Sequence, residues 1–131
     1  MKKITDKLFW VAAIALGAIF VSQQLSANNG IDAKQAQGMT QQGALLLDVR
    51  QPEEFASIRA PDAKLIPLGD LPARLPEIAA YKDKPIVVMC RSGRRSAKAV
   101  ELLKEAGYSN VSNLAGGIQD WEKDGLEVVR M

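Results

Sequence analysis

The apolar run Ile86–Met89 leads directly into a polar segment at residues 90–96, and a helical pattern follows over residues 96–106. Consecutive apolar residues of this kind are typical of a short strand that is buried on both faces of a parallel sheet. The apolar residues of the last segment recur at the i, i+3, i+4, i+7 spacing of an amphipathic helix. The sequence therefore predicts a buried strand, a tight loop and a helix, in that order.

The same alternation of short apolar runs and helical patterns recurs along the chain. Strands are predicted at residues 44–47, 63–66, 85–89 and 111–114, and helices at residues 31–37, 52–58, 70–80, 96–106 and 118–123. Gly38 and Gly43 are expected to end the first helix, and Pro72 and Pro76 to split or tilt the third. This order predicts one α/β domain at residues 28–131, with a central, mainly parallel sheet flanked by helices.

The loop holds the only cysteine of the chain, and its composition indicates a reactive thiol. Its residues are Cys90, Arg91, Ser92, Gly93, Arg94, Arg95 and Ser96. Inward-turned backbone N–H groups and the positive end of the next helix can bind an anion at such a loop. Gly93 permits the positive φ angle that a sharp bend needs. Because cations and helix N-termini lower the pKa of a thiol, we expect Cys90 to be a thiolate.

The residue types that the chain lacks restrict its chemistry. With no histidine and one cysteine, a Cys–His pair, a Ser–His–Asp triad, a histidine-ligated metal, a cysteine-rich zinc site and an internal disulfide are excluded. No metal or other cofactor is expected, and backbone dipoles and cations must activate Cys90. The alternative of a buried, inert cysteine is disfavoured because three arginines lie within five positions of it.

The net positive charge of the chain lies in its N-terminal segment, and the loop carries a local cluster of cations. The net charge is +2, but residues 1–27 carry that excess and the remainder is formally neutral. A neutral body argues against a nucleic-acid partner, which requires a broad basic face. One or more of the loop arginines could simply form solvated pairs with Glu101 or Glu105. We expect a monomer that binds a small anion.

The N-terminal residues 1–27 have the layout of an export signal. Lys2 and Lys3 precede an apolar run from Leu8 to Val21, which is shorter than most membrane-spanning helices. Ala27 could precede a cleavage point, although Leu25 occupies a position where a small residue is preferred. The sequence therefore predicts a periplasmic protein, or one anchored in the inner membrane with its domain facing the periplasm.

The loop and several other segments resemble rhodanese-type sulfurtransferases. The similar segments include 47–50, 52–55, 66–68 and 114–118, together with Trp121, and they occur in the family's order from about Ile31 to Val129. With its predicted leader and single domain, the chain resembles the small periplasmic members, including the phage-shock type. It departs from the family at residues 58–63, where a histidine and two glycines are replaced. That departure leaves open the shape of this loop and of the pocket rim.

The resemblance implies the rhodanese fold and a double-displacement reaction. Cys90 would attack the outer sulfur of thiosulfate, and the resulting persulfide would pass its sulfur to a thiophilic acceptor such as cyanide or a thiol. Backbone N–H groups of residues 91–96 would cradle the persulfide, and the three loop arginines would hold the sulfonate or tune the charge of the site. Asp48 and Arg50, at the end of the preceding strand, would support the loop, unless they form only a structural ion pair.

Two other functions are compatible with such a loop. Related phosphatases place five residues between the nucleophilic cysteine and an arginine, whereas four residues separate Cys90 from Arg95. The shorter loop favours a sulfur atom over a phosphate. A persulfide carrier or redox-sensing module that lacks efficient turnover is the main alternative.

Overall fold

The computed structural model describes residues 30–131 of the chain. The segment predicted to direct export, residues 1–27, lies outside the described residues, so both export and the domain boundary at residue 28 stay predictions. Across residues 30–131, none of the helices combines the length and the apolar character needed to cross a membrane.

Four parallel strands form the central sheet in the order β3-β1-β4-β5. Their bounds are Leu45–Asp48 for β1, Lys64–Leu65 for β3, Ile86–Met89 for β4 and Val111–Asn113 for β5. Asp48 at the end of β1 pairs in register with Met89 at the end of β4. The predicted parallel sheet is confirmed, and its register brings the residues that follow β1 and β4 to the same edge.

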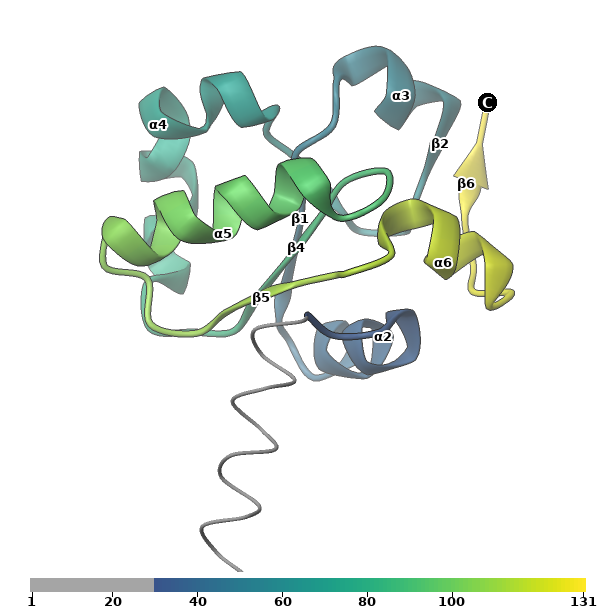
Figure 1. Cartoon of the computed structure of the whole chain (residues 1–131), viewed down its shortest axis with the longest axis horizontal. Helices are drawn as coiled ribbons and strands as arrows, with labels where there is room; N and C mark the ends of the chain where they lie inside the picture. The colour runs from purple at the N-terminus through teal and green to yellow at the C-terminus, as the bar shows by residue number, and fades with distance from the viewer. Residues whose placement is uncertain (1–29) are drawn as a thin grey trace, which may run out of the picture.

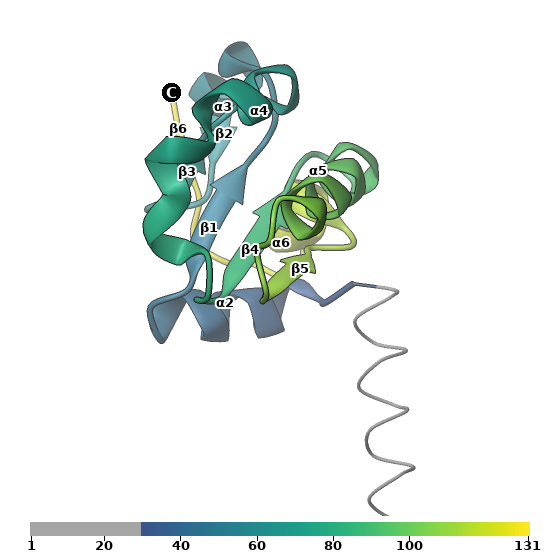
Figure 2. The same ribbon diagram turned by 90° about the vertical axis from the view of Figure 1, so that its left-hand side faces the viewer.

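Helices cover both faces of this sheet. Figure 1 shows the strands between α5 above and α2 below, and Figure 2 shows β1, β4 and β5 side by side above α2. One layer contains α4 (Leu71–Arg74), α5 (Arg94–Glu105) and the 3-10 segments η1 (Leu68–Asp70) and η2 (Leu75–Tyr81). The opposite layer contains α2 (Ala33–Gln41) and α6 (Gly117–Lys123).

The side chains of β4 alternate between the two layers. Ile86 and Val88 pack in the core beneath α5, and Cys90 continues that side beyond the strand. Val87 and Met89 pack in the core against α2 and α6. This alternation follows from the pleat of a strand, in which successive side chains point to opposite faces. It fixes the direction of the Cys90 side chain toward the beginning of α5.

Several helix boundaries differ from those predicted. α2 continues through Gly38 to Gln41 instead of ending at residue 37. Its fully buried Ala33 and Ala36 side chains hold the helix against the core. The predicted helix at 70–80 consists of the separate pieces η1, α4 and η2, as its prolines indicated. α5 begins at Arg94, two residues earlier than predicted.

A small antiparallel sheet was not predicted. α3 spans Pro52–Ser57 and ends where β2 (Ile58–Arg59) begins, and β2 pairs with β6 (Val129–Arg130) near the C-terminus. The predicted helix at 52–58 is therefore wrong at its last residue. Each of these strands has two residues, which is too short for an alternating pattern to be visible in the sequence.

Candidate active site

Cys90 is the first residue after β4 and is only 1% exposed. The backbone N–H of Val49, which follows β1, donates to the carbonyl of Met89 at 2.9 Å. The cysteine therefore lies at the carboxyl edge of the sheet, between the ends of two neighbouring strands. This is the edge at which parallel α/β sheets usually place their sites, and the predicted position of Cys90 is confirmed.

Gly93 allows the loop to turn close to the backbone that follows β5. Its φ angle is +97°, the left-handed region that favours glycine, as the sequence indicated. A Cβ atom at this position would lie 2.0 Å from the carbonyl oxygen of Ala115. A side chain at residue 93 would therefore displace the loop from its support.

The beginning of α6 supports the other side of the loop. The carbonyls of Cys90 and Arg91 accept hydrogen bonds from the N–H groups of Ile118 (2.9 Å) and Gln119 (3.3 Å). Gly117 makes this approach possible, because a Cβ atom there would lie 2.4 Å from the Arg91 carbonyl oxygen. This turn, which belongs to the family-like segment 114–118, therefore shapes the loop.

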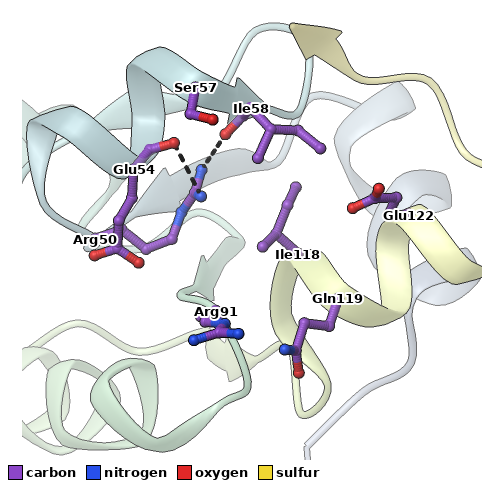
Figure 3. A pocket seen from close by; sticks show the side chains of 8 residues that line it. All are labelled: Arg50, Glu54, Ser57, Ile58, Arg91, Ile118, Gln119 and Glu122. Atoms are coloured by element: carbon purple, nitrogen blue, oxygen red, sulfur yellow. Dashed lines mark hydrogen bonds between the residues drawn. The ribbon is translucent and has the colours of Figure 1, made fainter.

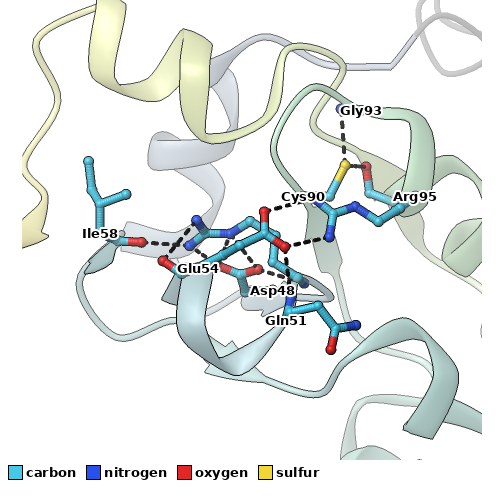
Figure 4. A network of polar contacts seen from close by, with 9 residues as sticks. Asp48, Gln51, Glu54, Ile58, Cys90, Gly93 and Arg95 are labelled. Atoms are coloured by element: carbon cyan, nitrogen blue, oxygen red, sulfur yellow. Dashed lines mark hydrogen bonds and ion pairs between the residues drawn. The ribbon is translucent and has the colours of Figure 1, made fainter. Parts of the chain in front are cut away.

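The sulfur of Cys90 lies between two hydrogen-bonding groups of the loop. The N–H of Gly93 donates to Sγ at 3.1 Å (Figure 4), and Ser96 Oγ lies 3.3 Å from Sγ. The Ser96 hydroxyl donates its proton to Asn113 Oδ1 at 2.6 Å. Both Gly93 and Ser96 were predicted as loop residues of the site, and the structure brings both to the sulfur.

Two opposing effects act on the pKa of Cys90. Burial is the largest, and it raises the pKa because a thiolate loses hydration. Hydrogen bonds from the Ser96 hydroxyl and from the backbone N–H groups of Ser96, Ser92 and Gly93 lower it, and together they prevail. The pKa of Cys90 is therefore lowered, as predicted. The main lowering causes are hydrogen bonds, whereas the sequence analysis assigned part of this role to the arginines.

The loop cations surround an open hollow. This hollow has a volume of about 640 Å³ and is lined by Cys90, Arg91, Ser92, Arg94, Arg95, Ala97 and Lys98. Arg91 and Arg94 are exposed and take part in no ion pair among residues 30–131. No acidic side chain from residues 30–131 lines this hollow, so it is suited to a small anion.

Arg95 differs from the other two loop arginines because it is paired. Its guanidinium donates to the two carboxylate oxygens of Glu54 on α3 at 2.7 and 2.9 Å (Figure 4). The sequence left open a pair between a loop arginine and Glu101 or Glu105. Arg95 is instead paired with Glu54, which lies far away in the sequence. The Glu54 bond raises the pKa of Arg95, so this residue stays charged beside the hollow.

Asp48 and Arg50 form a buried ion pair behind the site. Their exposed side-chain fractions are 0% and 2%, and the Arg50 Nη2 to Asp48 Oδ2 distance is 2.7 Å. Arg50 also donates to the carbonyl of Ile58 at 2.7 Å and to that of Glu54 at 3.4 Å (Figure 4). The pair thus connects the end of β1 to α3 and β2. It supports the loop only indirectly, through Glu54.

A second hollow adjoins the first through Arg91, which lines both. It has a volume of about 370 Å³ (Figure 3) and is lined by Arg50, Glu54, Ser57, Ile58, Arg91, Ile118, Gln119 and Glu122. Ile58 belongs to the segment 58–63 that departs from the family pattern. That segment contains a turn in which Asp62 has a φ angle of +61°. Only the first residue of the departing segment therefore lines this second hollow, whereas Pro61 and Asp62 lie elsewhere on the surface.

Two contacts of the site were missed by the sequence analysis. They are those of Glu54, which the sequence placed only in the family-like segment 52–55, and of Asn113, which no motif singled out. The position of Asn113 at the end of a predicted parallel strand was a usable signal, because such ends meet at the edge that carries Cys90. No comparable signal identified Glu54 as the partner of Arg95.

Comparison with protein families matches residues 32–124, more than half of the chain, to the family described as the rhodanese-like domain. This chain belongs to the rhodanese-like domain family. The resemblance found in the sequence is confirmed at that level, and the parallel sheet flanked by helices is the rhodanese fold. The narrower likeness to periplasmic, phage-shock-type members stays a prediction.

Known proteins similar to this rhodanese-like chain include two curated bacterial enzymes. A sulfurtransferase of Allochromatium vinosum is 45% identical over 85 residues, which cover 65% of this chain and 78% of that protein. The thiosulfate sulfurtransferase GlpE of Pseudomonas syringae is 37% identical over 91 residues, which cover 70% and 84%. Other relatives are longer, and the matched part makes up 61% of the length of one and 18% of the length of another.

Solved structures of rhodanese-like proteins have the same fold. The rhodanese-related protein of Thermoplasma volcanium superposes on this chain with a TM-score of 0.69 and 33% sequence identity. The alignment covers 76% of this chain and 96% of that one. The shared architecture therefore extends over nearly the whole of that protein.

Proposed function

We propose that this chain is a sulfurtransferase that moves the outer sulfur of thiosulfate through a persulfide on Cys90 to a thiophilic acceptor. The observation that carries the proposal is the environment of Cys90. Its buried sulfur accepts a hydrogen bond from the Gly93 N–H, lies beside the Ser96 hydroxyl and lines a cationic hollow. The thiosulfate sulfurtransferase activity in the name of the Pseudomonas syringae relative supports the same choice of donor.

In the first step, the Cys90 thiolate attacks the outer sulfur of thiosulfate. The sulfur–sulfur bond of thiosulfate breaks, sulfite leaves with the bonding electron pair, and a persulfide forms on Cys90. No general base is needed, because hydrogen bonds from the loop lower the pKa of the thiol. Arg94 and Arg91 have no ion-pair partner among the described residues, so both are free to bind the sulfonate oxygens.

In the second step, the acceptor attacks the outer sulfur of the persulfide. A new bond forms between the acceptor and that sulfur, the persulfide bond breaks, and its electron pair returns to Cys90 as the thiolate. Cyanide yields thiocyanate, and a thiol yields a new persulfide. No oxidant or reductant is required, because the two displacements together transfer one neutral sulfur atom.

The charge of the hollow favours thiosulfate over an organic donor. Thiosulfate is a compact dianion, whereas 3-mercaptopyruvate has one carboxylate. Four cations line the hollow that contains Cys90, and oriented cations and N–H groups stabilise the negative charge that moves to the departing sulfite. We therefore expect a higher kcat/KM with thiosulfate than with 3-mercaptopyruvate.

Sulfur loading of Cys90 tests the proposal directly. Incubation of the protein with thiosulfate should increase its intact mass by one sulfur atom, and cyanide should remove that mass and form thiocyanate. Wild-type protein alkylated beforehand is the matched control and should gain no sulfur, because Cys90 is the only cysteine. Sulfur transfer by the Cys90→Ser variant would contradict the mechanism.

A persulfide carrier is the second candidate, and the same burial of Cys90 favours it. A sulfur that is only 1% exposed holds a persulfide away from solvent and could deliver it to one docked partner. Sulfite release separates the two functions. Continuous release with cyanide present indicates turnover, whereas one equivalent of sulfite followed by no further release indicates a carrier.

A further inference from the structure

Asn113 at the end of β5 contacts both loop residues that hold the Cys90 sulfur. Its Oδ1 accepts a hydrogen bond from Ser96 Oγ at 2.6 Å, and its Nδ2 donates to the carbonyl of Gly93 at 3.2 Å. Gly93 N–H and Ser96 Oγ are in turn the groups at 3.1 and 3.3 Å from Sγ. Asn113 is therefore linked to the sulfur through two routes.

The Gly93 carbonyl fixes the orientation of the Asn113 amide. An amide side chain has one accepting end and one donating end, and only the donating end can face a carbonyl oxygen. The accepting Oδ1 must therefore face Ser96. The Gly93 carbonyl also accepts a hydrogen bond from the N–H of Ala97 in α5 at 3.2 Å. α5 therefore fixes the orientation of this carbonyl. Rotating the amide would place two oxygens against each other.

Ser96 has only one hydroxyl proton for two acceptors. With Cys90 as a thiol, the S–H group donates to Ser96 Oγ, and the hydroxyl donates to Asn113, so every group is satisfied. With Cys90 as a thiolate, the sulfur needs the same proton that Asn113 accepts. If the Ser96 hydroxyl turns to donate its hydrogen bond to the sulfur, the Ser96 Oγ and Asn113 Oδ1 atoms remain 2.6 Å apart with no proton between them. That arrangement is unfavourable.

We propose that Asn113 is a positioning residue that competes with the Cys90 sulfur for the single hydroxyl proton of Ser96 and so limits the fraction of thiolate. Once an outer sulfur is bound, Sγ no longer carries the full negative charge, and the Ser96 hydroxyl again donates its hydrogen bond to Asn113. The residue therefore favours the sulfur-loaded state over the free thiolate. This consequence for turnover rests on the proposed function, but the competition itself does not.

The charged groups near the sulfur do not depend on Asn113. They are the cations that line the hollow from the loop and α5, Glu54 of α3 and Asp48 of β1 beside Arg95, and Asp120 beside Gly116 at the start of α6. β5 contributes no charged residue. A change in Cys90 ionisation on substitution of Asn113 therefore reports the neutral hydrogen-bond competition.

The pH dependence of Cys90 alkylation tests this inference in the full chain without any sulfur donor. The rate of iodoacetamide addition, followed by intact mass, reports the thiolate because the chain has no other cysteine. In Asn113→Ala, the Ser96 proton is free for the sulfur, so the midpoint pH should fall by about one unit. Asn113→Leu, which fills more of the same space, should lower the midpoint similarly.

A purely structural role for Asn113 predicts the opposite result. Loss of a brace would loosen Gly93 and Ser96, weaken their hydrogen bonds to the sulfur, and raise the midpoint. Ser96→Ala should also raise it, and Asn113→Ala should then produce no further change in the Ser96→Ala background. Ser112→Ala, at the neighbouring position of β5, is the matched control and should leave the midpoint unchanged.

An unchanged or raised midpoint in both single Asn113 variants would overturn the inference. So would a lowered midpoint that persists in the Ser96→Ala background, because the effect would then bypass the shared proton. Failure of the wild-type protein to take sulfur from thiosulfate would instead contradict the proposed function and leave these alkylation midpoints unaffected. The two proposals are therefore distinguished by separate measurements.

Discussion

At the scale of single residues, the site depends on how a buried thiol without a histidine partner becomes ionised. Cys90 is removed from solvent, which opposes the thiolate, and hydrogen bonds from Ser96, Ser92 and Gly93 reverse that effect. The arginines contribute mainly to the hollow that a substrate anion would enter. In the proposed mechanism, activation of Cys90 and binding of the donor therefore fall to different residues of the same loop.

Arg94 and Arg95 should respond differently to truncation. Arg94→Ala removes an exposed cation of the hollow that forms no ion pair within the described part of the chain. The substitution should raise the KM for thiosulfate about tenfold, the usual effect of losing a charged hydrogen bond. Arg95→Ala should weaken thiosulfate use and also lower the free energy of unfolding, because it breaks the pair with Glu54. Steady-state kinetics and urea unfolding measure the two effects.

Lys104→Ala is the control for these variants, because it removes an exposed cation from the far end of the same helix. It should change neither KM nor stability. Wild-type kinetics in both arginine variants would mean that these cations are only surface charge.

At the scale of elements, the loop is shaped by what lies against it. α6 donates to the carbonyls of Cys90 and Arg91, and the backbone after β5 leaves no room for a side chain at Gly93. On the opposite side, the Glu54–Arg95 pair joins α3 to the first turn of α5. The position of the thiol thus depends on contacts from three elements that are distant in the sequence.

The Glu54–Arg95 pair should make stability depend on acidic pH. The hydrogen bond from Arg95 is the main cause that lowers the pKa of Glu54 from 4.5 to about 2, although burial opposes it. Because the folded-state pKa is the lower one, the stabilisation is complete above pH 4.5 and is lost as the pH falls toward about 2. Urea unfolding across this pH range should show that the free energy of unfolding falls less steeply for Glu54→Gln than for the wild type.

Glu53→Gln provides the comparison for this pH series. Glu53 is an exposed neighbour on α3 and has no ion pair within residues 30–131. Its variant should follow the wild-type curve more closely than Glu54→Gln does. Identical curves for the wild type and Glu54→Gln would show that the pair does not contribute to folding.

At the scale of the whole molecule, the Asp48–Arg50 pair connects the sheet to the peripheral elements. It is the only ion pair in the described part of the chain with both side chains almost fully buried. Arg50 also reaches the carbonyls of Glu54 and Ile58, and β2 then pairs with β6 near the C-terminus. This one guanidinium therefore connects the end of β1 to α3 and to the small β2–β6 sheet.

Arg50→Met should therefore destabilise the fold strongly. It leaves the Asp48 carboxylate buried without its partner, which typically costs about 3–5 kcal/mol. Arg130→Met removes an exposed pair with Glu122 and should cost less than about 1 kcal/mol. Denaturant unfolding of both variants measures the difference in the free energy of unfolding. If both variants lose a similar amount, the Asp48 carboxylate is solvated or hydrogen-bonded by other groups.

Much of the fold could be predicted because its signals are local. The apolar run Ile86–Met89, the helical spacing after it and the glycine in the loop each depend on neighbouring residues, and all three are confirmed. The antiparallel β2–β6 pair and the continuation of α2 through Gly38 could not be predicted, since packing against distant segments decides them. The export segment stays a prediction from composition alone.

The sequence by itself determined the lone cysteine, the cationic loop and the strand-loop-helix unit that carries them. The tertiary structure decided how these groups are partnered. It paired Arg95 with Glu54, separated by 41 positions, and placed Asn113 against Ser96, separated by 17. The physical reason is that residue types and local spacing are written along the chain, whereas a hydrogen-bond partner is chosen by the register and packing of elements that meet only in the folded state.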